Sequence, residues 1–234
     1  MDVMLQGIDV VKEYDNGELK VVAVKGMNFT INKGELVVIL GQSGAGKSTL
    51  LNLIGGMDYV TSGSLIVDGN DIAKYTTKQL IDYRRNNIGF VFQFYNLMPN
   101  LTAKENVELA TELKKDALDP VEVLTSVGLK YKIDNFPAQL SGGEQQRVSI
   151  ARAIAKNADI ILCDEPTGAL DYETGKEILA LLAKQAREFN KTVIIVTHNS
   201  ALSDMADHLI RVKNGQIAVD QYNDNPKDIK DIEW

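Results

Sequence analysis

The stretch Gly41-Gln42-Ser43-Gly44-Ala45-Gly46-Lys47-Ser48-Thr49 matches G-x-x-x-x-G-K-[ST], the pattern of a phosphate-binding loop. An apolar, β-branched run at residues 35–40 precedes it and predicts a buried strand, and a helical pattern that ends at Gly55-Gly56 follows it. Glycines let the backbone wrap closely around a polyphosphate, and the N-terminus of the new helix favours negative charge. The alternative, a glycine-rich turn without a ligand, is disfavoured because strand, loop and helix come in the expected order.

Two side chains of this loop have specific predicted roles. Lys47 supplies a mobile positive charge for the β- and γ-phosphates, and Ser48 supplies a hydroxyl ligand for Mg²⁺. We therefore expect the nine residues of the stretch to bind a nucleotide together with Mg²⁺.

The composition limits the possible classes of protein. The 234 residues are 44% hydrophobic and 24% charged, as expected of a globular domain with a substantial core. A net charge of −7 argues against a dedicated nucleic-acid binder. Cys163 is the single cysteine, which excludes an intramolecular disulfide and suits a reducing cytosol. No signal peptide is seen, and no apolar run approaches the roughly 20 residues of a membrane span. We therefore expect any work at a membrane to depend on a partner.

The apolar pattern predicts an α/β fold. Alternating runs at 4–14 and 20–32, separated by a turn at Asp15-Asn16-Gly17, predict an antiparallel β subdomain at the N-terminus. Buried strands at 160–163 and 192–197, separated by helical patterns, predict a mainly parallel core sheet. Hairpin turns are expected at two further places, Asp68-Gly69 and Asn214-Gly215.

Helix starts follow from residue pairs with capping-box spacing. These pairs are Thr76 and Gln79, Thr102 and Glu105, Ser141 and Glu144, and Thr174 and Glu177. The helix that begins after Thr102 is expected to reach about Asp116, and a short helix is expected over residues 200–208, which places His208 in a helix without chemistry.

These elements predict one domain with three parts. Residues 1–93 and 157–219 are expected to form the nucleotide-binding core, and residues 94–156 a helical sub-lobe inserted between two strands. The polar tail, 220–234, is expected to be loosely attached.

Four polar residues follow predicted strands, where the ligand site of a doubly wound sheet lies. Asp164 is predicted to hold Mg²⁺, with turn capping as its alternative, and Glu165 to polarise an attacking water. His198 is predicted to bind the γ-phosphate and orient that water, although a lone strand-end histidine is more often structural. Gln93 is either a surface polar residue or a contact to Mg²⁺ or water from a movable loop.

Two features outside these strand ends have two interpretations each. Tyr14 is either a half-buried strand aromatic or a flat platform for a purine ring. Ser141-Gly142-Gly143 is either a plain capping box or a second anion site at a helix N-terminus. A second anion site would suit a nucleotide held between two identical subunits, each offering its phosphate loop to one ATP and its Ser141 helix to the other.

The ordered motifs resemble ATP-binding cassette (ABC) transporter ATPases over essentially the whole chain. The residues that carry the resemblance are Gly41–Thr49, Gln93, Leu140-Ser141-Gly142-Gly143-Glu144-Gln145-Gln146-Arg147, Leu162-Cys163-Asp164-Glu165-Pro166, Ala169-Leu170-Asp171 and His198. The resemblance implies an ABC-type P-loop NTPase that uses ATP and Mg²⁺ and forms a homodimer in the ATP-bound state.

The resemblance also implies a role for each motif. Tyr14 resembles the adenine-stacking aromatic, Gly41–Thr49 the Walker A loop and Gln93 the Q-loop glutamine, which senses Mg²⁺ and couples to the membrane subunit. Asp164 and Glu165 resemble the Walker B aspartate and the catalytic base, and His198 the switch histidine. Ser141, Gly142 and Gly143 resemble the signature that contacts the γ-phosphate across the dimer, and Asp171 the D-loop aspartate at its interface.

The segment that runs from Phe94 to Pro99 is aromatic and apolar, and it is either a loop that packs locally or one that docks a partner. We expect the transmembrane permease to dock near it. The longer segment Phe90–Pro99 and the run Pro166-Thr167-Gly168-Ala169-Leu170-Asp171 resemble the lipoprotein-releasing, macrolide-exporting, antimicrobial-peptide-resistance and cell-division subgroup. Gln42 replaces a proline common in that subgroup, Phe94 replaces a common glutamine, and the helical sub-lobe is short.

The leading hypothesis is an ATPase subunit on the inner face of the cell membrane that drives export, or extraction from the membrane, through a separate permease. The alternative is a mechanical or signalling switch in which the same ATP cycle bends a membrane partner without moving a substrate. A soluble cassette ATPase bound to DNA or ribosomes lacks support from a coiled-coil insertion, a second cassette or a basic tail. A P-loop kinase would have no use for the run Ser141–Arg147.

Overall fold

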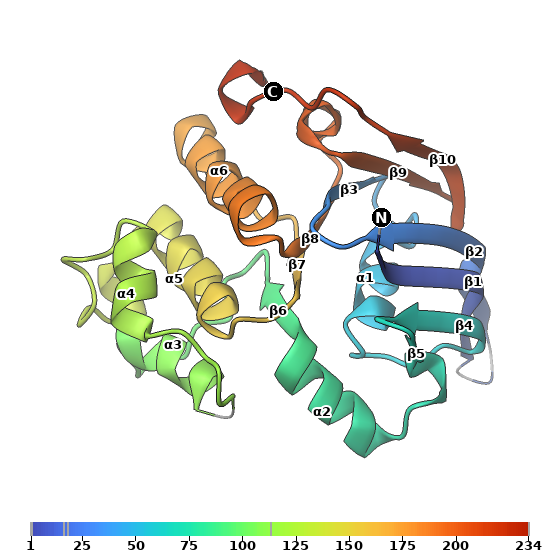
Figure 1. Ribbon diagram of the computed structural model, residues 1–234, viewed down its shortest axis with the longest axis horizontal. Helices are drawn as coiled ribbons and strands as arrows, with labels where there is room; N and C mark the ends of the chain where they lie inside the picture. Colours follow the sequence, from blue (N-terminus) through green and yellow to red (C-terminus); the bar gives the residue numbers. More distant parts are fainter. Residues whose placement is uncertain (1, 16, 18, 113, 234) are drawn as a thin grey trace.

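The computed structural model describes residues 2–15, 17, 19–112 and 114–233, so the predicted turn through Asn16 lies outside the described residues. One of its two sheets is antiparallel, with the strand order β2-β1-β4-β5 (Figure 1). Its strands are β1 (Val3–Asp15), β2 (Lys20–Asn32), β4 (Ser62–Val67) and β5 (Asn70–Asp71). The predicted N-terminal β subdomain is confirmed, as is the hairpin at Asp68-Gly69, which joins β4 to β5.

The second sheet has the order β10-β9-β3-β8-β7-β6 and is parallel except for β10. Its strands are β3 (Leu36–Leu40), β6 (Ile88–Val91), β7 (Ile160–Asp164), β8 (Thr192–Thr197), β9 (His208–Lys213) and β10 (Gln216–Tyr222). All residues of β3 and β8 are buried, which explains their unbroken apolar pattern. The predicted parallel core sheet and the hairpin at Asn214-Gly215 are therefore confirmed.

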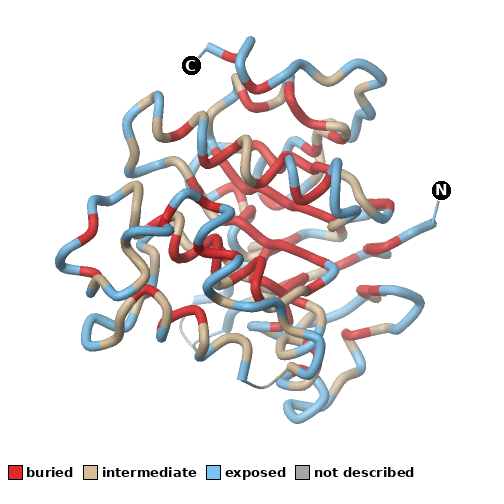
Figure 2. The backbone as a smooth tube through the Cα atoms, turned by 60° about the vertical axis from the view of Figure 1, so that its left-hand side comes forward, coloured by how far each residue is buried: buried red, intermediate tan, exposed pale blue. Residues whose placement is uncertain are grey.

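Helices cover both faces of this parallel sheet (Figure 1). Of the helices, α1 (Lys47–Ile54) lies on one face, and α5 (Gly142–Ala155) and α6 (Tyr172–Phe189) lie on the other, whereas α2 (Thr77–Asn87) leads into β6 and α3 (Ala103–Thr111) and α4 (Pro120–Ser126) pack against α5. Alternate residues of β3 serve two cores: Val37 and Ile39 pack with α1 and the antiparallel sheet, whereas Val38 packs with α5 and α6. The buried residues accordingly concentrate in the middle of the molecule (Figure 2).

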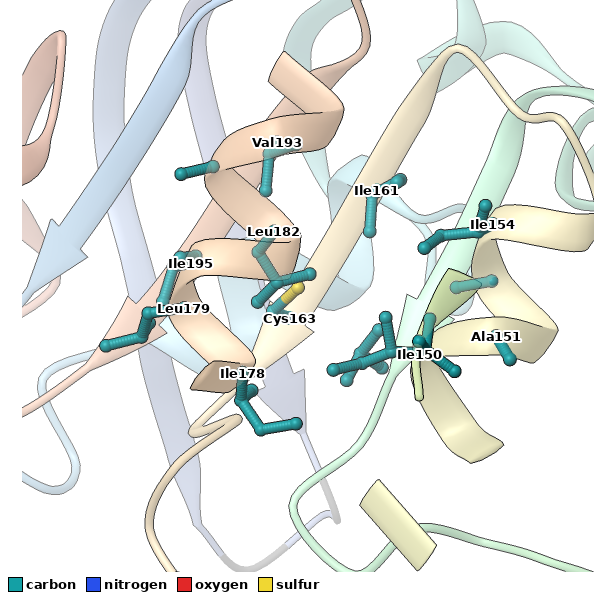
Figure 3. Close-up of a cluster of buried hydrophobic side chains, with 14 of the residues drawn as sticks. Ile150, Ala151, Ile154, Ile161, Cys163, Ile178, Leu179, Leu182, Val193 and Ile195 are labelled. Atoms are coloured by element: carbon teal, nitrogen blue, oxygen red, sulfur yellow. The ribbon is translucent and has the colours of Figure 1, made fainter. Parts of the chain in front are cut away.

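The helix α6 packs against β7 and β8 near the carboxyl ends of these strands. Ile178 and Leu182 of α6 lie in one buried cluster with Cys163 of β7 and Ile195 of β8 (Figure 3). Since β7 and β8 are parallel neighbours, their carboxyl ends meet at one edge of the sheet. The residues that follow the two strands therefore lie close together.

Two predicted helix boundaries are wrong. The helix α3 ends at Thr111 and not near Asp116, because the chain turns back and the backbone N–H of Leu118 donates to Ala155 at the end of α5. The helix α6 is capped by Asp171 and not by Thr174, whose own backbone N–H donates to Asp171 Oδ1 at 3.0 Å. The three other predicted capping boxes are present.

Two predictions for the C-terminal part are also wrong. Residues 200–208 do not form one helix: Ser200–Met205 is a 3-10 helix, and His208 begins β9, where it is fully buried. The tail is not loosely attached, because Ile229 and Ile232 are buried beside α6. Hydrogen bonds from α6 to the carbonyls of residues 230 and 232 hold the tail there.

Candidate active site

The phosphate-binding loop joins the end of β3 to the start of α1. Gly46 has φ 103°, and a Cβ at this position would lie 2.4 Å from the carbonyl oxygen of Ala23 in β2. Gly44 also has a positive φ, of 76°. Only glycine combines this backbone conformation with such a close approach, so the loop packs directly against β2.

Lys47 is buried and points into the loop. Its Nζ donates to the carbonyl oxygens of Gly41 at 2.8 Å and Gln42 at 3.0 Å. The side chain is only 7% exposed. A buried cation held by carbonyl oxygens is ready to pair with an anion such as a phosphate.

The loop forms one wall of an open cavity of about 1110 Å³. Every residue of the loop lines it, together with Gln93, Asp164, Glu165 and His198. The structure thus brings together these four residues from three strand ends. Tyr14, Asp171 and the residues Ser141–Gly143 do not line this cavity.

Asp164 and Ser48 form the part of the cavity that suits a hard cation. Ser48 Oγ donates to Asp164 Oδ1 at 3.3 Å. Burial raises the pKa of Asp164 and the neighbouring Glu165 raises it further, against the opposing effects of Ser48 and Lys47. No group of three or more His, Cys, Asp or Glu side chains suited to a metal occurs among the described residues. A hydroxyl and one carboxylate nevertheless fit Mg²⁺, which takes few protein ligands and fills its other positions with water and phosphate oxygens.

Glu165 is held by the end of β8. Its Oε1 lies 2.8 Å from His198 Nδ1, and its Oε2 accepts a hydrogen bond from Thr197 Oγ1 at 2.9 Å. The Glu165 side chain is 15% exposed, whereas that of His198 is 70% exposed to the cavity and solvent. A carboxylate fixed on two sides beside an exposed imidazole can accept a proton from a positioned water.

The sequence reasoning missed Thr197 and part of the cavity wall. The signal for Thr197 was present, since it is the last residue of a buried strand and directly precedes His198. The missed wall residues on β9 and the turn after it are Arg211, Val212, Lys213 and Asn214. These residues lie far from the loop in sequence, and the hairpin turn predicted at Asn214 does not indicate that they reach it, so only the pairing of β9 with β3 places them there.

Ser141 begins α5 with the predicted capping box. Its Oγ accepts the backbone N–H of Glu144 at 3.2 Å, and Glu144 Oε2 accepts the N–H of Ser141 at 2.8 Å. A Cβ at Gly142 would lie 3.0 Å from the Tyr95 hydroxyl, and one at Gly143 would lie 2.5 Å from Thr174 Cγ2. The two glycines therefore permit close contacts with neighbouring segments.

Tyr14 and Asp171 lie outside the cavity, and each forms a hydrogen bond within the chain. The Tyr14 hydroxyl donates to Asp58 Oδ2 at 2.8 Å, and 43% of the residue is exposed. Asp171 is an exposed N-cap, and its hydrogen bond with the Thr174 backbone lowers its pKa. Within its own chain, Asp171 therefore acts as the N-cap of α6.

The segment 94–99 presents apolar side chains on the surface. Phe94 is 77% exposed and Met98 is 50% exposed. Tyr95 and Asn96 both have positive φ, and Arg152 of α5 donates to their carbonyl oxygens at 2.8 and 2.7 Å. The segment is therefore anchored to the helix that Ser141 begins.

The ABC transporter family model matches residues 24–168, which include the phosphate-binding loop, the Ser141 helix and the Asp164-Glu165 pair. The chain belongs to the ABC transporter family. The resemblance predicted from the sequence is thereby confirmed.

Curated relatives of this ABC family member agree with the match. An uncharacterized ABC transporter ATP-binding protein of Thermotoga maritima is 45% identical over 93% of this chain and 94% of its own length. The macrolide export ATP-binding/permease protein MacB of Shigella flexneri is 44% identical over 93% of this chain. The chain spans 34% of MacB and 49% of a putative ABC transporter ATP-binding protein of Mycoplasma pneumoniae, which is 43% identical.

Solved structures of ABC cassettes share the fold of this family member. The ATP-binding cassette MJ0796, in a dimeric post-hydrolysis state bound to ADP and Pi, superposes with a TM-score of 0.87 at 41% identity. The match covers 94% of this chain and 98% of MJ0796. The predicted ABC-type P-loop NTPase fold is confirmed. Among the residues that the structure describes, no helix has the length and apolar character needed to cross a bilayer.

Proposed function

We propose that this chain is the ATP-hydrolysing subunit of an ABC transporter, which dimerises around two ATP molecules and drives a membrane permease. The observation that carries the proposal is the cavity in which the phosphate-binding loop, the Ser48–Asp164 pair and the Glu165–His198 pair meet.

The phosphate-binding loop and Lys47 bind the triphosphate of ATP. The backbone N–H groups of residues 41–49 surround the phosphates, and Lys47 exchanges its carbonyl partners for phosphate oxygens. Tyr14 stacks on the adenine base, since 43% of the residue is exposed and its hydroxyl is held by Asp58.

Ser48, Asp164 and Gln93 would hold Mg²⁺, which would supply positive charge to offset that of the triphosphate. All three residues line one cavity, and the Ser48 hydroxyl lies 3.3 Å from the Asp164 carboxylate.

Glu165 acts as the general base, and His198 orients the attacking water. Glu165 accepts a proton from the water that attacks the γ-phosphate, and Thr197 and His198 hold its carboxylate in place. The exposed side of the imidazole of His198 hydrogen-bonds the γ-phosphate. The two neighbouring acids thus have separate duties, since Asp164 faces Ser48 and Glu165 faces His198.

A second copy of the chain completes each ATP site. Ser141, Gly142 and Gly143 contact the γ-phosphate bound by the partner, and Asp171 lies at the interface between the two subunits. Supporting this arrangement, these residues lie outside the cavity of their own subunit, and the cassette MJ0796 has been solved as a dimer.

The segment 94–99 docks the permease. Its exposed Phe94 and Met98 offer an apolar surface, and Arg152 joins the segment to the helix of the signature residues. The relative MacB is named as an export ATP-binding/permease protein, which favours export or extraction from the membrane. The chain then lies in the cytoplasm, on the inner face of the membrane.

Two measurements test this proposal. Phosphate release should require both ATP and Mg²⁺ and should be abolished in Lys47→Ala, whereas the exposed-site control Lys184→Ala should retain it. Gentle solubilisation of native membranes followed by mass spectrometry should recover a membrane permease with the tagged chain, and substitution of Phe94 and Met98 by Ser should reduce that recovery. Hydrolysis that survives Lys47→Ala, or recovery of no membrane protein, contradicts the proposal.

A further inference from the structure

Asp58 lies in the loop between α1 and β4, and its side chain contacts two residues of β1. Its Oδ2 accepts the hydrogen bond from the Tyr14 hydroxyl at 2.8 Å. Its Oδ1 lies 2.5 Å from Lys12 Nζ and 2.7 Å from the backbone nitrogen of Tyr59. Both carboxylate oxygens are thus fully engaged, and one of them holds the tyrosine.

Lys12 supports the tyrosine ring from one side. The residue is only 8% exposed, and its Nζ also donates to the carbonyl oxygen of Tyr59 at 2.9 Å. The same Nζ lies 4.8 Å from the centre of the Tyr14 ring, which is cation–π distance. A cation thus lies over the ring while 43% of Tyr14 remains exposed, which leaves aromatic surface for a flat ligand.

The Asp58 loop also ties Tyr14 to the phosphate-binding loop. The backbone N–H groups of Met57 and Asp58 donate to the carbonyl oxygen of Asn52, near the end of α1. Tyr14 is therefore fixed relative to the helix whose N-terminus faces the phosphates.

We infer that Asp58 and Lys12 are positioning residues that hold the Tyr14 ring ready for the adenine base of the bound nucleotide. The inference rests on the proposed function, in which Tyr14 stacks on adenine. A tyrosine without these contacts would lose side-chain freedom on binding, and this ordering lowers affinity roughly three- to tenfold. Asp58 itself touches neither base nor phosphate and acts through Tyr14.

The test compares ligands with and without a base by calorimetric titration of the full chain. Asp58→Ala should weaken ADP binding roughly three- to tenfold and leave tripolyphosphate binding unchanged. Asp58→Asn, which keeps an acceptor for the Tyr14 hydroxyl, should recover most of the ADP affinity. Asp82→Ala, at an exposed carboxylate on α2 far from this network in the chain, is the control and should bind both ligands normally.

Tyr14→Phe provides a second variant that keeps the ring and removes only its hydroxyl. It should weaken ADP binding about as much as Asp58→Ala does, and the double variant should lose no more than either single one, because both break the same contact. Equal losses for ADP and tripolyphosphate in Asp58→Ala, or no loss for ADP, would overturn the inference.

The wild-type chain and Tyr14→Ala separate this inference from the proposed function. A wild-type chain that binds neither ADP nor tripolyphosphate overturns the proposed function itself. Normal ADP binding by Tyr14→Ala in a chain that hydrolyses ATP leaves the ATPase in place and overturns the positioning role. A loss for ADP alone in Tyr14→Ala supports both.

Discussion

Glu165 adopts a backbone conformation that residues with a side chain rarely take. Its φ is 46°, in the left-handed region, which costs about 1–3 kcal/mol in a residue other than glycine. The conformation lets the backbone N–H donate to Val196 of β8 at 2.9 Å while the carboxylate meets Thr197 and His198. Strain that the surrounding contacts maintain at this residue is consistent with its proposed role as the base.

The first prediction concerns this carboxylate. Glu165→Gln removes the proton acceptor but keeps the size of the side chain, so we expect ATP turnover to fall by roughly 10²–10⁴-fold. Nucleotide affinity should change little, because the phosphate-binding loop is intact. Steady-state phosphate release and equilibrium nucleotide binding measure the two effects separately.

The matched control is Glu188→Gln, which changes an exposed carboxylate near the end of α6. Turnover of this variant should equal that of the wild type. A Glu165→Gln chain that hydrolyses ATP at the wild-type rate would assign the base to another residue.

Most cavity residues could be predicted from the sequence because strand ends are easy to find. Asp164, His198 and Gln93 each follow an apolar run, and parallel strands bring such ends to one edge of the sheet. Arg211 and Lys213 could not be found in this way, since they belong to an edge hairpin whose pairing with β3 no local pattern reveals.

At the scale of elements, a charge cluster around the buried His208 joins β9 and β10 to the residue before β3. His208 Nε2 lies 2.5 Å from Asp220 Oδ1, and Nδ1 lies 3.5 Å from Glu35 Oε2. The imidazole also stacks on Tyr222, with ring centres 4.2 Å apart. Burial lowers the pKa of His208, but the two carboxylates outweigh burial and hold it above the ordinary 6.5. Burial raises the pKa of Glu35, but His208 and Asn32 outweigh it and hold it below 4.5.

These pKa shifts predict a pH-dependent stability. The contribution of His208 is complete below its unfolded pKa of about 6.5 and is lost as pH rises through its raised folded pKa. The contribution of Glu35 is present above about 4.5 and is lost as pH falls through its lowered folded pKa. The cluster should therefore stabilise the fold most between these two values.

Urea unfolding of His208→Gln at several pH values tests this second prediction. The variant should be less stable than the wild type by the largest margin between about pH 4.5 and 6.5, and the margin should shrink at higher pH. A margin for His208→Gln that does not change with pH would contradict a charged His208.

A third prediction concerns the docked C-terminal segment. Ile232 is 2% exposed and lies beside α6, so Ile232→Ala should remove about 2 kcal/mol or more of packing free energy. Amide protons of residues 229–231 should then exchange at least roughly tenfold faster, while those of α6 remain protected. Glu233→Ala, at the exposed neighbouring position, is the control. Unchanged exchange in Ile232→Ala would show that the segment is held by other contacts.

The sequence predicted which helices and strands exist more accurately than it predicted the residues at which they begin and end. Asp171 and Thr174 are both good N-caps, and which of them caps α6 depends on the turn after β7, which the local sequence does not define. His208 and Ile232 are buried by partners distant in sequence, Glu35 and α6 respectively. Periodicity within one segment cannot indicate such long-range contacts.

At the scale of the whole molecule, the phosphate-binding loop and the residues Ser141–Gly143 lie at separate places within one chain. Ser141, Gly142 and Gly143 do not line the cavity that contains Lys47 and Glu165. A two-fold dimer in which each subunit contributes Ser141–Gly143 to the other's ATP brings the two together twice. Because the dimer is two-fold symmetric, the same interface contains both ATP sites.

The measurement that tests this composite site most directly is the molar mass of Glu165→Gln by light scattering, with and without saturating Mg-ATP. The mass should be 25.8 kDa without nucleotide and twice that value with it, since ATP that is not hydrolysed keeps the dimer closed. Adding Ser141→Arg to the same chain should keep it monomeric while it still binds ATP. A Glu165→Gln chain that stays at 25.8 kDa in saturating Mg-ATP would contradict the composite site.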